Sequence, residues 1–236
     1  MDRRRERFNH TLNELGADLI IESLITYQSE ERVVKIKDVI SKRLKSVQVA
    51  VENPTNLHNA LALIRSAEGV GVQGVHLVDV QSRKWPRGKQ TTQGATHWME
   101  IHHYNRIGDL LAHMKDEGFA IAGGVPGAEM ELSEVPVQQP VCMILGNEEV
   151  GLSEEALAGC DYLYSIPMYG MSQSLNLSVS GALTLYDIVT RKRKSMKELG
   201  DFSPKQQNIE LAWHLYRLIG DGRAQHYLDY HNRSPL

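Results

Sequence analysis

The segment IPMYGMSQSLNLSVSGALTLYD, which begins at Ile166, holds the side chains best suited to bind a ligand. Its first three residues predict the end of a strand. Tyr169 to Ser174 form a loop of small and polar residues, and an apolar-periodic helix follows from about Asn176. A loop between a strand end and a helix start is where α/β proteins usually bind ligands, because backbone N–H groups converge there. We therefore expect a ligand site at this loop.

Two earlier segments also carry polar side chains in apolar surroundings. In the first, Asn59 and Arg65 stand six residues apart on an apolar helix. In the second, LGNEEVGL, a buried strand runs into Gly146 and then into Glu148. Glycine permits close approach of the backbone to a ligand. Each segment has a structural alternative, since Arg65 could be an ion-pair partner and Glu148 a first-turn acid of a helix.

Several familiar functional motifs are absent from the sequence. The run GVGVQG at Gly69 fits a dinucleotide fingerprint by letters, but it follows a helix and precedes a strand, which is the wrong context. There is no P-loop, no nucleophile elbow and no histidine spacing typical of a metal site. Cys142 and Cys160 lack a CxxC partner and are interpreted as small buried side chains in a reducing compartment. We therefore expect no metal.

Hydrophobic periodicity predicts strands that alternate with helices. The strands are expected at 47–51, 74–80, 98–103, 119–125, 141–145 and 162–166. The helices are expected at 3–15, 30–44, 56–69, 106–118, 154–159 and 176–194, with two more between 202 and 230. This alternation predicts an α/β core at residues 46–195, a mostly parallel sheet with helices on both faces. Residues 1–45 and 196–236 are expected to be helical extensions.

The net charge of −3 alone argues against a strongly nucleic-acid-binding protein, but the basic residues are clustered. The clusters lie at 35–45, 83–89 and 191–197. One such cluster could equally be a solvated helix end or loop, whereas three together favour a surface for a polyanion. No apolar run is long enough to span a membrane, and no apolar segment follows the basic start of the chain. We therefore expect a cytoplasmic protein.

The three polar segments resemble the motifs of the SpoU/TrmH family of SPOUT RNA methyltransferases. The patterns are N-x5-R, GNExxG and IPM-x5-SLN-x-S, in this order, over about residues 46–195. Within the family, the residue pattern from Gly170 to Asn176 and the helical extensions are most similar to those of the tRNA (guanosine 18) 2′-O-methyltransferases. The resemblance implies a deep trefoil knot in the sheet, S-adenosyl-L-methionine as methyl donor, tRNA as partner and a symmetric homodimer.

The resemblance also implies a role for particular residues. Those matching the catalytic positions are Asn59, Arg65, Glu148, Ser174 and Asn176. Those matching the cofactor-binding positions are Gly124, Gly146, Ile166, Met168 and Leu175. Those matching positions of RNA contact are Lys35, Arg43, His58, Arg191 and Arg193, and the N-terminal extension is expected to contact tRNA. The sequence WPRGKQ at 85–90 differs from the family pattern.

The implied reaction leaves three points open. Arg65 either accepts the proton of the ribose hydroxyl while a phosphate engages it, or stabilises the developing alkoxide while phosphate or water takes the proton. The long helix from Asn176 could form the dimer surface or pack in the core, through Val179, Leu183, Leu185, Ile188 and Val189. The alternatives for function are methylation of rRNA or of another tRNA position, and a catalytically silent RNA-binding protein on the same fold.

Overall fold

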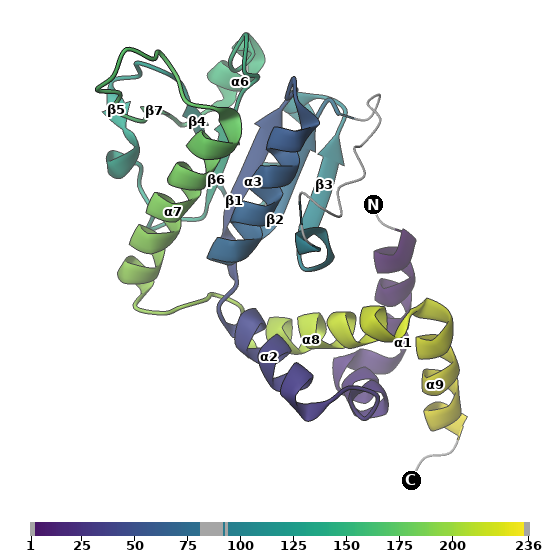
Figure 1. Ribbon diagram of the computed structural model, residues 1–236. Coiled ribbons are helices and arrows are strands. Elements are labelled where there is room, and N and C mark those ends of the chain that lie inside the picture. The colour runs from purple at the N-terminus through teal and green to yellow at the C-terminus, as the bar shows by residue number, and fades with distance from the viewer. Residues whose placement is uncertain (1–2, 81–91, 93, 234–236) are drawn as a thin grey trace. The chain divides into compact units, whose positions relative to one another are not determined.

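A parallel sheet forms the centre of the unit made by residues 44–199 (Figure 1). The structure, a computed structural model, describes residues 3–80, 92 and 94–233. Its strands are β1 (Leu44–Glu52), β2 (Val72–Val78), β3 (Glu100–Tyr104), β4 (Ala120–Gly124), β5 (Met130–Glu131), β6 (Val141–Leu145) and β7 (Tyr162–Ser165). In the described part of the chain the strand order is β3-β2-β1-β6-β4-β7-β5, and every pairing between these strands is parallel.

Helices cover both faces of the sheet. Successive residues of a strand point to opposite sides, so a strand of continuous apolar residues presents apolar side chains on both faces. On one face, α3 (Leu57–Val70) and α7 (Leu177–Met196) pack against Val49 and Val51 of β1 and against Met143 of β6. On the other face, α5 (Ile107–Asp116) and α6 (Glu154–Gly159) pack against Ala50 and Ile144. The expected α/β fold with a mostly parallel sheet is thereby confirmed.

The helices next to the sheet edge have clear start and stop signals. Asn56 caps α3 by accepting a hydrogen bond from the His58 N–H, and Gly71 ends the helix in the left-handed region with φ 87°. Asn176 caps α7 and Ser153 caps α6 in the same way. Short 3-10 turns occur at η1 (Ala95–His97) and η2 (Leu132–Glu134). Capping side chains therefore fix where α3, α6 and α7 begin.

The two ends of the chain together form the second unit, residues 1–43 with 200–236. Its helices are α1 (Arg3–Ile25), α2 (Glu30–Ser41), α8 (Pro204–Ile219) and α9 (Asp221–Arg233). The Phe8 ring lies 5.2 Å from the Trp213 ring, and Tyr27 stacks on Tyr227 at 3.9 Å. The two extensions thus pack against each other and share one apolar core, which periodicity along the chain did not predict.

Several sequence expectations need correction. The helix expected at 30–44 ends at Ser41, and Leu44 already belongs to β1. The first helix was expected to end near residue 15, but α1 continues to Ile25 through a kink at Gly16, whose φ is 77°. The third strand begins at Glu100 and not at 98. The short strand β5 lies in a segment that was expected to be a loop.

The basic cluster at 83–89 and the WPRGKQ segment lie outside the described residues. No helix in the described ranges is long and apolar enough to cross a membrane.

Candidate active site at the carboxyl edge of the sheet

The three sequence motifs meet in one hydrogen-bond network at the carboxyl ends of the strands. The Glu148 carboxylate accepts a hydrogen bond from the Asn59 side-chain amide at 2.8 Å and another from the Thr55 backbone N–H at 2.6 Å. The Asn176 side chain donates to the carbonyl oxygen of the Asn59 side chain at 3.2 Å. Both ends of the Asn59 amide are therefore engaged, which fixes its orientation.

Strand order explains why these segments meet. β1 and β6 are adjacent and parallel, with Val51 opposite Leu145, so the chain leaves both strands at the same edge. The segment after β1 leads into α3 and carries Asn59, and the loop after β6 carries Glu148. The helix α7, which begins after Asn176, packs beside α3 (Figure 1). The order of strands reverses between β1 and β6, and such switch points are the usual ligand sites of open parallel sheets.

The network keeps Glu148 ionised. Partial burial alone would raise the pKa of the carboxyl, but hydrogen bonds from Asn59 and from nearby backbone N–H groups act in the opposite direction. The pKa of Glu148 therefore lies below its ordinary value. A carboxylate that accepts these bonds orients its donors and is poorly suited to supply a proton near neutral pH.

The loop that carries Glu148 is closed by its own backbone. Asn147 and Gly151 exchange two backbone hydrogen bonds of 2.9 Å each, and the Asn147 side chain donates to the Asn53 carbonyl at 2.6 Å. A Cβ on Gly146 would lie 2.3 Å from the carbonyl carbon of Gly151, so this position excludes any side chain. The glycine pattern of the second motif thus makes a tight loop that presents Glu148.

The left-handed conformation of Gly151 gives a first testable prediction. Gly151 has φ 74° and open space around its α-carbon, so Gly151→Ala is expected to lower the free energy of unfolding by about 1 kcal/mol through backbone strain. Gly69 lies in α3, also faces open space and has no positive φ, so Gly69→Ala is the matched control and should raise stability by up to about 1 kcal/mol. Urea unfolding measures both values. Equal effects of the two substitutions would contradict the interpretation.

The third motif begins α7. The Asn176 side chain accepts hydrogen bonds from the Ser178 N–H at 2.9 Å and from the Ser178 hydroxyl at 2.6 Å while it donates to Asn59. Ser174 lies two residues earlier in the exposed loop. The cap of the helix is therefore also the link between the third motif and the first.

Arg65 takes no part in the hydrogen-bond network of Glu148, Asn59 and Asn176 within this chain. It is exposed on α3, and no hydrogen bond or ion pair to it occurs among the residues that the structure describes. Six residues of α-helix separate it from Asn59, a rise of about 9 Å along the helix axis. Among the described residues, the ion pair that the structural alternative for Arg65 requires is not present.

The predicted cofactor residues gather at three neighbouring strand ends. Gly124 ends β4, Gly146 follows β6 and Ile166 follows β7, and these strands are adjacent in the order β6-β4-β7. Met168 is 37% exposed, and Leu175 is half-buried. Glycine permits close approach of the backbone to a ligand, and partly exposed apolar side chains can cover the faces of an uncharged nucleoside base. These residues therefore fit S-adenosylmethionine.

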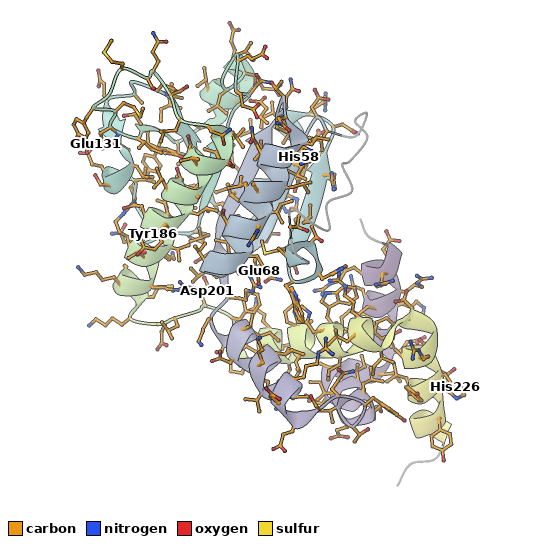
Figure 2. All side chains as sticks on the ribbon, viewed as in Figure 1. His58, Glu68, Glu131, Tyr186, Asp201 and His226 are labelled. Atoms are coloured by element: carbon orange, nitrogen blue, oxygen red, sulfur yellow. The ribbon has the colours of Figure 1, made fainter. Side chains whose placement is uncertain are left out.

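The basic residues predicted to contact RNA differ in their surroundings. Lys35 is exposed on α2, and His58 is exposed at the start of α3, at the carboxyl edge of the sheet (Figure 2). Arg43 is only 3% exposed. Lys35 and His58 are therefore open to a ligand, whereas the burial of Arg43 does not support direct contact with RNA.

The basic run at the end of α7 is engaged with backbone carbonyls. Arg191 donates to Leu132 and Val135 at 2.8 and 2.7 Å. Arg193 donates to Val70 and Leu199 at 2.9 and 2.8 Å, and burial lowers the pKa of Arg193. The side chains of this run thus fasten neighbouring loops to the helix, and their contact with RNA stays a prediction.

Sequence reasoning missed one buried acid beside the site. Glu52 ends β1, is 7% exposed and accepts two hydrogen bonds from Ser153. The signal was present, because an acidic residue at the end of an apolar strand seldom occurs without a partner. Its partner could not be identified from spacing, since 101 residues separate the two.

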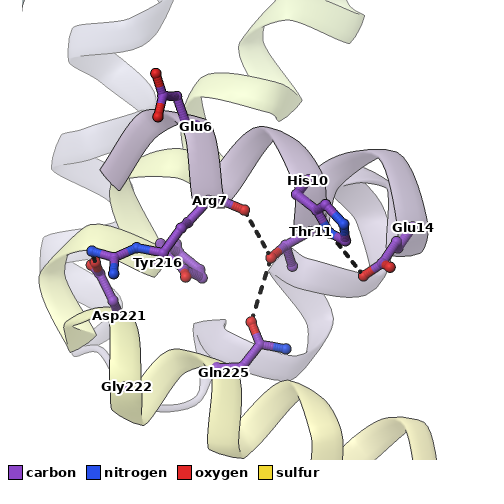
Figure 3. Close-up of a pocket in the computed structure, with 9 residues that line it drawn as sticks. All are labelled: Glu6, Arg7, His10, Thr11, Glu14, Tyr216, Asp221, Gly222 and Gln225. Carbon is purple, nitrogen blue, oxygen red and sulfur yellow. Dashed lines mark hydrogen bonds and ion pairs between the residues drawn. The ribbon is translucent and has the colours of Figure 1, made fainter. Parts of the chain in front are cut away.

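A cavity of about 780 Å³ lies in the unit formed by the chain ends (Figure 3). Its walls carry the carboxylates of Glu6, Glu14 and Asp221, and Arg7 pairs with Asp221 at 2.6 Å. This excess of negative charge is unsuited to phosphate. None of the predicted catalytic or cofactor-binding residues lines it, so the carboxyl edge of the sheet remains the candidate site.

The fold and the site define an α/β protein with an open parallel sheet. Its candidate ligand-binding loops meet where the strand order reverses, between β1 and β6. Residues 46–186 match the SpoU rRNA Methylase family, and the chain belongs to this family. The tRNA (guanosine(18)-2′-O)-methyltransferase of Escherichia coli (strain K12) is 34% identical over 170 residues, which are 70% of this chain and 72% of that protein.

Two solved structures are also similar. The A. aeolicus TrmH/SpoU tRNA modifying enzyme has a TM-score of 0.74 and 29% identity, over 81% of this chain and 98% of that chain. The SpoU methyltransferase AviRb from Streptomyces viridochromogenes in complex with the cofactor AdoMet has a TM-score of 0.58 and 26% identity, over 67% of this chain and 64% of that chain.

Proposed function

We propose that this chain transfers a methyl group from S-adenosylmethionine to the 2′-hydroxyl of a ribose in tRNA, at guanosine 18. The observation that carries the proposal is the network of Glu148, Asn59 and Asn176, which joins the three family motifs in one site. The names of relatives such as the E. coli enzyme support tRNA as the substrate and guanosine 18 as the position. The match covers 72% of the E. coli relative.

The methyl donor would bind at the ends of β4, β6 and β7. Gly124, Gly146 and Ile166 would contact it through their backbone, and Met168 and Leu175 would cover its apolar parts. When bound, S-adenosylmethionine supplies a methyl group on a positively charged sulfur atom. The complex of AviRb with this cofactor supports the assignment. The chain's own residues hold the reacting groups in line, which is the main requirement for this displacement.

Arg65 would act on the ribose and its phosphate. Its guanidinium has no internal partner among the described residues, so both edges are open to a phosphate and a ribose oxygen. A guanidinium remains protonated near neutral pH and is a poor base. We therefore favour stabilisation of the developing alkoxide by Arg65, with phosphate or water taking the proton, over proton transfer to Arg65 itself.

The site would be completed in a symmetric homodimer. Val179, Leu183 and Tyr186 form an exposed apolar stripe on α7 and are 46%, 47% and 67% exposed. Tyr186 points away from the sheet in Figure 2. The other three residues considered for a dimer surface, Leu185, Ile188 and Val189, are instead buried in the core. A second chain against this stripe could bring its Arg65 to the first chain's cofactor site.

Further features of the family belong to the same proposal. We propose that the segments after β6 and β7 form the deep trefoil knot, with the cofactor inside it. The unit made by the chain ends would contact tRNA, with Lys35 as one phosphate ligand. Binding would then depend on shape and phosphate contacts, because the reaction leaves the base unchanged. A cytoplasmic location agrees with a tRNA substrate.

The proposal is tested with labelled S-adenosylmethionine. The chain is incubated with unmodified tRNA, with the same tRNA bearing 2′-deoxyguanosine at position 18, and with rRNA. We expect label in the first tRNA only, and a 2′-O-methyl group at guanosine 18 on mapping. Label in rRNA alone would instead favour the function in the family's description, rRNA methylation. RNA binding without label in any substrate would favour a silent RNA-binding protein.

A further inference from the structure

Glu52 is a buried acid whose carboxylate is hydrogen-bonded to Ser153. It is the last residue of β1 and is 7% exposed. Its Oε1 accepts a hydrogen bond from the Ser153 hydroxyl at 2.6 Å, and its Oε2 accepts one from the Ser153 backbone N–H at 3.0 Å. A carboxylate away from water costs free energy unless it is hydrogen-bonded, so these two bonds fix Ser153 against the end of β1.

Ser153 stands where the Glu148 loop ends and α6 begins. While its hydroxyl donates to Glu52, the same oxygen accepts a hydrogen bond from the Ala156 N–H at 3.1 Å and caps the helix. The preceding residue, Leu152, is buried in the core on the α6 face of the sheet. The far end of the loop is therefore attached to β1, to α6 and to the core.

The near end of the loop is attached to the residue after Glu52. Asn147 donates to the Asn53 carbonyl at 2.6 Å. Asn53 has φ 44°, in the left-handed region, where the chain turns as it leaves β1. Two consecutive residues at the end of one strand thus hold both ends of the loop, and Glu148 lies between the two attachments.

We propose that Glu52 is a positioning residue for methyl transfer. It acts through Ser153, holding loop residues 146–152 so that the Glu148 carboxylate meets Thr55 and Asn59. Because Glu52 is buried, it works through this loop and not by contact with RNA. The proposal rests on the function proposed above, and it adds a residue outside the three motifs to the machinery that orients Asn59.

Three variants separate positioning from general stability. Glu52→Met removes both acceptors at similar side-chain length. Glu52→Gln keeps one acceptor for the Ser153 N–H and can donate its amide to the Ser153 hydroxyl oxygen, so it is the conservative variant. Asp161→Ala is the comparison variant, because Asp161 is an exposed acid that also accepts a backbone N–H bond, from Ile121 at 2.8 Å, at the amino ends of β4 and β7.

The measurements are kcat and KM for tRNA, expressed per folded protein. Glu52→Met is expected to lower kcat by about tenfold to hundredfold, since small displacements of an orienting group are costly, and to leave KM for tRNA unchanged. Glu52→Gln is expected to restore most of the lost kcat. Asp161→Ala should lower thermal stability and leave kcat per folded protein at the wild-type value. Wild-type kcat in Glu52→Met, or an equal loss in Asp161→Ala, would overturn the positioning role.

Amide hydrogen exchange provides a readout that does not need catalysis. Glu52→Met is expected to accelerate exchange in the segment 149–151, and Asp161→Ala is not. If the wild-type chain methylates no RNA, the proposed function fails. The rate of amide hydrogen exchange then tests by itself whether Glu52 holds the loop. If Glu52→Met does not fold, Ser153→Ala removes the hydroxyl bond to Glu52 together with the cap of α6 and keeps the backbone bond. It is expected to shift kcat and exchange in the same directions. Unchanged exchange in the variant that folds would contradict the proposal.

Discussion

Replacing Arg65 with alanine is expected to lower kcat for tRNA methylation by about 10²- to 10³-fold. The side chain is exposed and has no internal partner among the described residues, so its removal should change the free energy of unfolding by less than about 0.5 kcal/mol. Affinity for S-adenosylmethionine should be unchanged, because the predicted cofactor residues lie on other segments. Turnover is measured with labelled methyl donor, and cofactor affinity by calorimetry.

The matched control is Arg106→Ala. Arg106 is also an exposed arginine at a helix of the same unit, paired with Asp109 at 3.0 Å, and its removal should leave kcat at the wild-type value. Arg65→Lys keeps the charge and loses the planar pair of donors, so it should recover only part of the activity. Full turnover in Arg65→Ala would refute both roles proposed for this guanidinium.

The second large effect is expected for Glu148→Ala, with a loss of about tenfold to hundredfold in kcat. The substitution leaves the Asn59 amide and the Thr55 N–H without their acceptor, so the asparagine can rotate away from its position. Stability should fall by only about 1 kcal/mol, because this carboxylate is near the surface and its donors can bind water instead. Steady-state kinetics at saturating tRNA and methyl donor measures the loss.

Glu149→Ala provides the comparison, since Glu149 is the exposed neighbour on the same loop and its side chain takes no part in the network. Its kcat should equal that of the wild-type chain. A loss of the same size in Glu149→Ala would indicate that the loop responds to any change of charge. The specific role of the bond between Glu148 and Asn59 would then be contradicted.

Much of the site could be predicted because its residues lie in short patterns with fixed spacing. Asn59, Glu148 and Asn176 were identified in this way, and the structure brings them into hydrogen-bond contact. What the sequence could not provide was the reason for the contact. The adjacency of β1 and β6 depends on strand order, and the periodicity of a strand carries no information about its neighbours.

Other predictions were limited because a local pattern does not identify a distant partner. The run from Arg191 to Arg193 has the composition of a phosphate-binding surface, but both guanidiniums bind carbonyls of segments far along the chain. Leu183 and Leu185 look alike in sequence, yet only Leu185 is buried. Glu52 shows the same limit, because its partner Ser153 belongs to another loop. In each case tertiary packing, and not local propensity, determines the role of the side chain.

The most direct test is a crystal structure of the chain with S-adenosylhomocysteine, the product of the methyl donor. We expect the ligand to lie against Gly124, Gly146 and Leu175 at the carboxyl edge of the sheet, inside a knotted segment. We also expect an Arg65 side chain, from the same chain or its dimer partner, to face the position of the transferred methyl group. A ligand bound elsewhere, or an Arg65 remote from it in every subunit of the assembly, would contradict the proposed site.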